Sequence, residues 1–94
     1  MSAVESVGSM TTNITDGTAQ VKTGPCAFGA LVITAVGVGA TVDIYDHTSA
    51  TTNRRAAWAT ADGKGIFAFR CRMRFGIRQV VTLGGAEGYI VWGD

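Results

Sequence analysis

The chain has 94 residues, the length of one small domain, and a formal net charge of +1. Only 16% of its residues are charged, so the composition excludes a globally basic nucleic-acid binder and an acidic disordered tail. Val and Ile together number 16 against two Leu, and Gly numbers 13, a composition typical of short strands joined by tight turns.

In chain order, the first segment is residues 1–9, which are small and mixed in character and predict a flexible N-terminal arm. Residues 10–94 then read as a single domain in which turn signals separate short apolar or alternating segments. The expected strands are residues 10–15, 18–23, 26–36, 40–45, 54–61, 66–73, 77–83 and 88–92. This pattern predicts an all-β fold, a small antiparallel, jelly-roll-like β-sandwich of about seven to eight short strands.

No apolar run approaches the roughly 20 residues that span a bilayer, and the N-terminus has neither a basic nor a hydrophobic leader region. We therefore expect no membrane segment and no secretion signal.

The clearest alternation runs from Phe67 to Leu83. Its odd positions are apolar except Gln79, and its even positions include four arginines: Arg70, Arg72, Arg74 and Arg78. Because successive strand side chains point to opposite faces, the pattern predicts a core face and an arginine stripe. The stripe is either an anion-facing surface, for an acidic protein or DNA phosphates, or a solvated sheet face paired with carboxylates. We favour the solvated face over nucleic-acid binding.

Two expected strands are apolar on both faces, in residues 30–36 and 89–92. A sandwich strand with one solvated face does not need this. A chain this short has little to spare as a cover, so we expect a neighbouring subunit to complete the burial.

The sequence offers few candidate catalytic or metal-binding residues. The single histidine, His47, lies in a polar loop over residues 46–53, and its neighbour Asp46 would point away on an extended chain. Cys26 and Cys71 are too few and too far apart in sequence to suggest a metal site with His47. The alternatives are a disulfide and two reduced, partly buried thiols, and without a secretion signal we expect the thiols. The sequence therefore predicts no enzyme, no metal and no cofactor.

Three stretches share a pattern with a known family: residues 29–36, residues 39–50 and residues 74–92. The second reads Gly-Ala-Thr-Val-Asp-Ile-Tyr-Asp-His-Thr-Ser-Ala. In this order of strand and turn signals the chain resembles the small β-sandwich virion structural proteins of tailed bacteriophages. His47 stands where that family often has Asn, and Phe75-Gly76 stands where it often has Asn-Gly.

The resemblance implies a capsid decoration or cement protein that stabilises the head by bridging major capsid subunits. It implies a homotrimer made in the host cytoplasm and placed on the capsid surface of the virion, with no small-molecule substrate and no nucleic-acid or membrane partner. The interface candidates are the arm, the four arginines of the stripe, and the aromatic residues Trp58, Tyr89 and Trp92. The alternatives are a tail, neck or fibre-base component, or a small nucleic-acid-binding module that uses the Arg70–Arg78 stripe.

Overall fold

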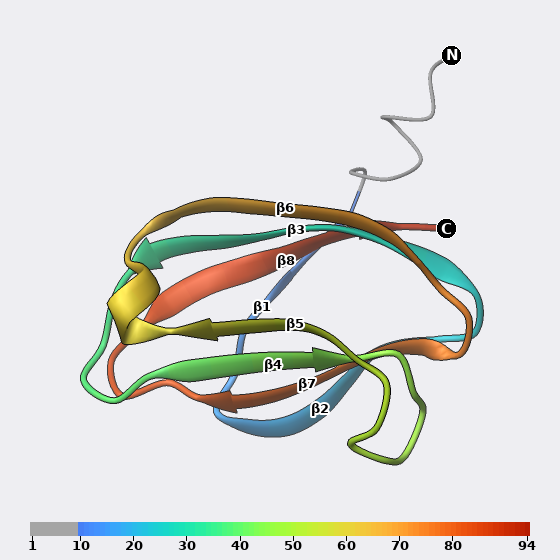
Figure 1. Cartoon of the computed structure of the whole chain (residues 1–94), viewed down its shortest axis with the longest axis horizontal. Helices are drawn as coiled ribbons and strands as arrows, with labels where there is room; N and C mark the ends of the chain where they lie inside the picture. Colours follow the sequence, from blue (N-terminus) through green and yellow to red (C-terminus); the bar gives the residue numbers. More distant parts are fainter. Residues whose placement is uncertain (1–9) are drawn as a thin grey trace.

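A computed structural model describes residues 10–94, which form eight strands and one short 3-10 helix (Figure 1). The strands are β1 (Met10–Asn13), β2 (Gly17–Thr23), β3 (Cys26–Ala35), β4 (Thr41–Tyr45), β5 (Arg54–Ala59), β6 (Gly65–Met73), β7 (Gly76–Thr82) and β8 (Glu87–Gly93), with the helix η1 (Thr60–Asp62) after β5. The eight predicted strands are confirmed, with ends that differ by at most two residues. The predicted arm, residues 1–9, lies outside the described residues.

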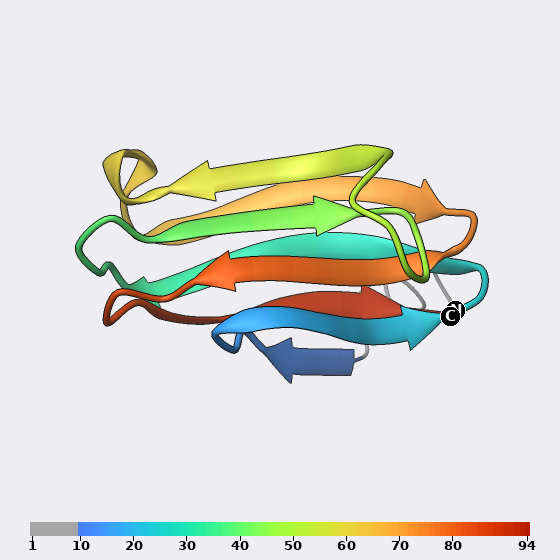
Figure 2. The ribbon, with the colours of Figure 1, turned by 90° about the horizontal axis from the view of Figure 1, so that it is seen from below.

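The strands form two four-stranded sheets with the orders β1-β8-β3-β6 and β2-β7-β4-β5, and every pairing is antiparallel. Consecutive strands change sheet at every connection except β4 to β5. This eight-stranded double-sheet order is that of a jelly roll. Figure 2 shows the two sheets laid face to face with their strands running in similar directions, which is the aligned packing of a β-sandwich. The predicted all-β sandwich is confirmed.

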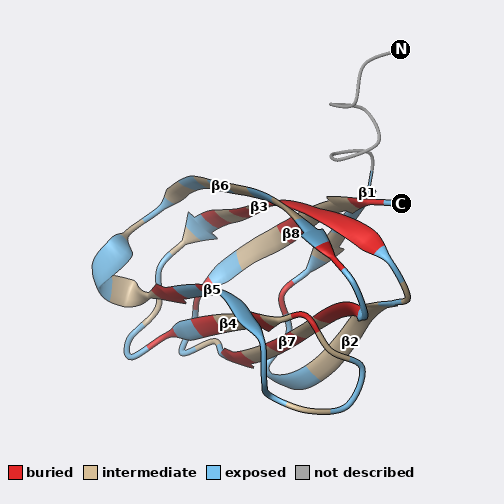
Figure 3. Cartoon of the chain, turned by 45° about the vertical axis from the view of Figure 1, so that its right-hand side comes forward, coloured by how far each residue is buried: buried red, intermediate tan, exposed pale blue. Residues whose placement is uncertain are grey.

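The core lies between the sheets and follows the alternation of each strand. Phe28, Leu31 and Ile90 of the first sheet, and Ile44 and Ile77 of the second, are fully buried. Figure 3 shows buried residues along β3, β4 and β7, while the connecting loops are largely exposed. Each such side chain contributes about 2 kcal/mol by leaving water, and together they hold the sheets in register.

Gln79 interrupts this core. It is 1% exposed on the inner side of β7, where its amide Nε2 donates to the Thr15 hydroxyl at 3.4 Å. Its carbonyl Oε1 has no hydrogen-bond partner among the described residues. The single polar position in the predicted core face is therefore buried, as are its neighbours Ile77 and Val81 on the same side of β7.

The alternation from Phe67 to Leu83 predicted one continuous sheet face. The segment does not form one. A turn at Arg74 and Phe75 separates β6, in the first sheet, from β7, in the second. Phe75, predicted on the core side, is 45% exposed in this turn. Gly76 begins β7 with φ of 145°, and a Cβ there would collide with the carbonyl oxygen of Lys22, so the corner requires glycine.

Candidate interaction surface

The outer face of the β1-β8-β3-β6 sheet is apolar at its centre. Two rows cross the strands, with Tyr89, Val32 and Ile66 in one register and Val91, Ala30 and Ala68 in the next. Their sequence neighbours point into the core, so these six side chains point outward. Ile66 is 75% exposed, Ala68 is exposed and the other four are partly exposed. We call these six residues the apolar outer face.

The opposite surface, on the β2-β7-β4-β5 sheet, is different in character. Its outward positions mix polar residues, such as Thr18, Gln20, Asp43 and Arg54, with Val80, Tyr45 and Ala57. The Arg54 guanidinium lies 3.4 Å from the Asp43 carboxylate. Such a face is satisfied by water and by its own polar pairs. The sandwich therefore has one solvated side and one side with apolar surface that no other described residue covers.

The four arginines predicted to form one stripe are divided between the two sheets. Arg70 and Arg72 are exposed on β6, beside the apolar outer face, and Arg74 is exposed in the turn after it. Arg78 lies on the outer side of β7, across the sandwich, where its Nη1 donates to the Gln20 side chain and to the Thr48 carbonyl at 3.4 Å each. The expectation of a single arginine surface is therefore wrong, because the chain changes sheet between Arg72 and Arg78.

The three aromatic candidates also have different positions. Trp58 is 3% exposed in the core, and its indole Nε1 donates to the Gly63 carbonyl at 3.0 Å. Trp92 is partly buried against the core and donates to the Thr12 hydroxyl at 3.0 Å, with the Lys22 ammonium 5.9 Å from its ring. Only Tyr89 belongs to the apolar outer face, so it alone of the three is placed to contact a partner there.

Among the residues that the structure describes, one buried charged group, Asp46, was not predicted to be constrained. Asp46 is 2% exposed, and its carboxylate accepts hydrogen bonds from the backbone amides of Arg74 at 2.9 Å, Phe75 at 2.7 Å and Gly76 at 3.3 Å. The Arg55 guanidinium lies 3.9 Å away. The carboxylate thus joins the end of β4 to the turn between β6 and β7. The sequence does suggest a capping role, because Asp is favoured where its carboxylate can accept hydrogen bonds from the free amides of a turn. It does not show which turn is capped, because the turn that Asp46 binds is distant in the chain.

The pKa of Asp46 reflects this environment. Burial alone would raise the pKa of the carboxyl, but the three backbone hydrogen bonds and the charge of Arg55 outweigh it, so the pKa lies below its ordinary value. The group is therefore held as a carboxylate, and its role is to order two loops.

His47 is bound into its own loop. Its Nδ1 accepts hydrogen bonds from the backbone amides of Thr48 at 2.9 Å and of Ser49 and Ala50 at 3.1 Å each. Its carbonyl accepts a hydrogen bond from the Gln20 side chain at 2.9 Å. Nδ1 is thereby occupied as the acceptor of three backbone hydrogen bonds in its own loop. Asp46 does not orient the imidazole as a catalytic carboxylate would, because its carboxylate binds a different turn.

Both cysteines are free thiols. Cys26 is fully buried and Cys71 partly buried on the core side of the first sheet, where the Cys71 sulfur lies 3.8 Å from the Met73 sulfur. Burial raises the pKa of both thiols, which keeps them protonated and unreactive at neutral pH. Within residues 10–94, no group of three or more His, Cys, Asp or Glu residues is arranged to hold a metal ion.

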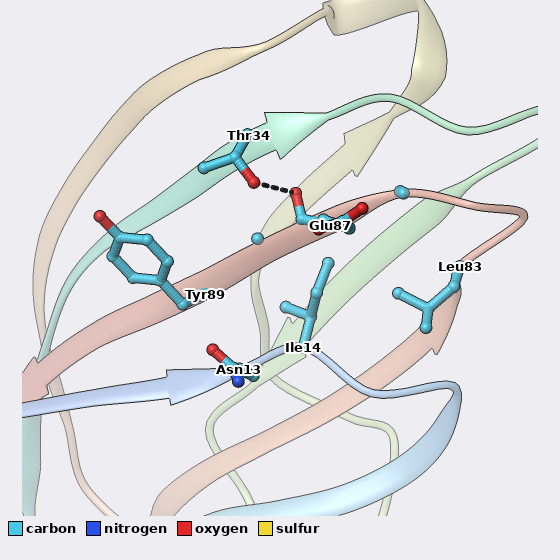
Figure 4. A pocket seen from close by; sticks show the side chains of 8 residues that line it. Asn13, Ile14, Thr34, Leu83, Glu87 and Tyr89 are labelled. Atoms are coloured by element: carbon cyan, nitrogen blue, oxygen red, sulfur yellow. Dashed lines mark hydrogen bonds between the residues drawn. The ribbon is translucent and has the colours of Figure 1, made fainter.

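A shallow depression of about 330 Å³ lies at one end of the first sheet and is open to solvent. Figure 4 shows Asn13, Thr34, Glu87 and Tyr89 around it, with Ile14 and Leu83 also among its lining residues; the Thr34 hydroxyl donates to the Glu87 carbonyl at 3.2 Å. Tyr89 is shared with the apolar outer face, so the depression continues that surface and places the exposed Glu87 at its end.

Comparisons with known protein families, with curated proteins and with solved structures find no match to this chain. In the part of the chain that the structure describes, no helix is long and apolar enough to cross a membrane.

Proposed function

We propose that the chain is a non-enzymatic structural subunit of a tailed-bacteriophage virion, a decoration or cement protein of the capsid surface that bridges major capsid subunits. The observation that carries this proposal is the apolar outer face on one side of a small jelly roll. Apolar side chains that line up across three strands, with no other described residue covering them, favour a protein whose work is adhesion.

The topology supports the same class without deciding it. Jelly rolls occur in viral capsid domains, but also in lectins and cupins, and a fold alone does not assign a function. The sequence pattern of residues 29–36, 39–50 and 74–92, which resembles phage virion proteins, favours the capsid among these possibilities.

A cement protein has to be rigid, and the loops at both ends of the sandwich are tied together. At one end, the Val38 amide donates to the Gly84 carbonyl at 2.9 Å, and the Leu83 amide donates to the Asp16 carboxylate at 3.0 Å. At the other end, Asp46 holds the turn before β7. A surface ordered before binding loses little entropy when it binds, which favours a subunit that acts through many repeated contacts.

The proposal is tested by the protein content of particles from the strain that encodes the chain. Particles purified on a density gradient are analysed by quantitative gel staining and mass spectrometry against the major capsid protein. A copy number similar to that of the major capsid protein is expected. A few to a few dozen copies would instead favour the tail, neck or fibre base, and absence from particles would overturn the proposal.

A variant of the apolar outer face separates specific attachment from trapping. Tyr89→Glu, in a particle preparation that lacks the parent protein, is expected to reduce incorporation at least about tenfold, because a charge replaces an apolar anchor. Thr82→Glu, on the outer side of the other sheet, is the matched control and is expected to be incorporated normally.

A further inference from the structure

The apolar outer face has opposite charges at its two ends. Arg72 on β6 lies opposite Ala27 of β3, and Glu87 on β8 lies opposite Ala35 of the same strand. At about 3.3 Å per residue, these two ends are about 26 Å apart, with the apolar rows between them. Arg72 and Glu87 are both exposed, and neither makes an ion pair within the described residues.

We propose that a second copy of this chain covers the apolar outer face, and that the two copies pack face to face about a two-fold axis across the strands near Ala30 and Val32. Such an axis exchanges the two ends of the face. It brings Arg72 over Glu87 of the partner subunit, and the same pair forms a second time by symmetry. This self-contact goes beyond the capsid role and does not depend on it. Because both contacts use the apolar outer face, the dimer is the form of the free chain and has to dissociate before that face attaches to the capsid.

The geometry of such a pair is one that sheets adopt. Arg72 and Glu87 lie on strands to either side of β3, so the line joining them runs about 20° from the strand direction, given the usual strand spacing of about 4.8 Å. A two-fold axis that exchanges them makes the strands of the two copies cross at about 40°. Packed sheets keep their strands within about 30° of each other, so the required crossing angle is close to the ordinary one.

The size of the face sets the strength of the contact. The strands β1, β8, β3 and β6 have 4, 7, 10 and 9 residues. At about 16 Å² of sheet plane per residue, the two copies would bury about 1,000 Å² in total, near the lower limit for a specific interface. We therefore expect a dimer that dissociates on dilution in the micromolar range.

Edge-to-edge pairing is the other way in which sandwiches associate, and the backbone of the edge strand β6 disfavours it. Its register with β3 shifts between Phe28 and Ala30, and Arg70, within this irregular stretch, has a φ of 49°. A bulge of this kind twists an edge strand and interrupts the row of groups that another strand would pair with. The face, rather than this edge, is therefore the surface for the second copy.

The first test is the molar mass of the full chain by light scattering over a dilution series. The expected result is twice the chain mass of 9.8 kDa at high concentration, falling to one chain on dilution. A single chain at every concentration, or a trimer mass, would overturn the two-fold contact.

Charge exchange then tests the pairing itself. Glu87→Arg and Arg72→Glu, each alone, are expected to weaken dimerisation about tenfold or more, since like charges then face each other twice. The double variant Arg72→Glu/Glu87→Arg is expected to recover the parent dissociation constant to within about threefold. Thr82→Arg adds the same charge to the other sheet and serves as the control. Single variants that dimerise like the parent, or a double variant that stays weak, would contradict the proposal.

Two further variants test whether the dimer contact lies on the apolar outer face or on residues 1–9. Val32→Glu places a charge at the centre of the face and is expected to give a folded monomer, with folding checked by circular dichroism. Deletion of residues 1–9 is expected to leave the dimer intact, and loss of the dimer would assign the contact to that segment instead. Particles that contain the chain, together with a monomer in solution, would overturn the self-contact alone. A dimer that is absent from particles would overturn the capsid role alone.

Discussion

At the scale of single residues, the buried Asp46 carboxylate joins two parts of the chain that are distant in sequence. One carboxylate satisfies three consecutive backbone amides of the turn where the chain passes from the first sheet to the second. Unpaired buried amides are costly, so this turn depends on an acceptor supplied from another part of the chain. The same carboxylate has a lowered pKa, which links the turn to pH.

We predict that Asp46→Asn lowers the free energy of unfolding by about 2 kcal/mol, because an amide replaces the charged acceptor and turns one oxygen into a donor facing amide hydrogens. The pKa is lowered in the folded protein, so the carboxylate stabilises above the ordinary value of 3.8 and this stabilisation is lost as the pH falls below it. Urea unfolding at neutral pH and at acid pH measures both effects.

The control for this experiment is Asp43→Asn, which removes a partly exposed carboxylate from its 3.4 Å pair with Arg54. Surface pairs contribute little, so a loss below about 1 kcal/mol is expected at neutral pH. Equal losses in the two variants, or an Asp46→Asn protein whose stability falls between neutral and acid pH as steeply as that of the parent, would contradict the role assigned to Asp46.

At the scale of elements, the strands could be predicted from the sequence because their limits are local. Asp16-Gly17, Gly24-Pro25 and Gly84-Gly85 mark turns by their own conformational preferences, and branched residues fill the segments between them. The two-sided apolar character of residues 30–36 and 89–92 was also visible, and these segments now form the centre of the apolar outer face.

The change of sheet between β6 and β7 could not be predicted from the same pattern. Met73 and Ile77, on either side of the turn, are both odd-numbered and both fully buried, so the strands before and after the corner have the same inward positions although Phe75 between them is exposed. Alternation reports inward and outward directions but not which sheet a strand joins. For this reason Arg78 was grouped with Arg70 and Arg72, although it lies on the opposite outer surface.

The bulge in β6 gives a prediction at this scale. Arg70 has a left-handed backbone with a φ of 49°, which costs a residue with a Cβ about 1 kcal/mol and costs glycine almost nothing. We predict that Arg70→Gly leaves the free energy of unfolding unchanged or raises it by up to about 1 kcal/mol. Chemical unfolding of dilute protein measures the change without a contribution from self-association.

Arg72→Gly is the comparison, since Arg72 is exposed on the same strand and does not have a positive φ. Glycine within an ordinary strand weakens it, so a loss of about 1 kcal/mol is expected. If both variants lost the same stability, the left-handed backbone at Arg70 would have no energetic consequence and the argument for a strained bulge would fail.

At the scale of the whole molecule, the two sides of the sandwich differ in what they need. The outer side of β2-β7-β4-β5 pairs its own polar groups, whereas the outer side of β1-β8-β3-β6 exposes apolar side chains between charged ends. Burial of that second side by another copy would add to the free energy of unfolding of the single chain. Self-association should therefore raise the thermal stability of the protein as well as its molar mass in solution.

We predict that the thermal midpoint of the parent protein rises with protein concentration, by about 3 to 5 °C for each tenfold increase above the dimer dissociation constant. A dimer that unfolds to two chains gains half of RT ln 10 per chain for each such step, and a domain of this size converts that free energy into several degrees. Val32→Glu, whose side chain points out of the same sheet, should show a midpoint independent of concentration. Calorimetry of both proteins over the same dilution series measures the difference, and equal slopes would mean that the apolar outer face contributes nothing to association.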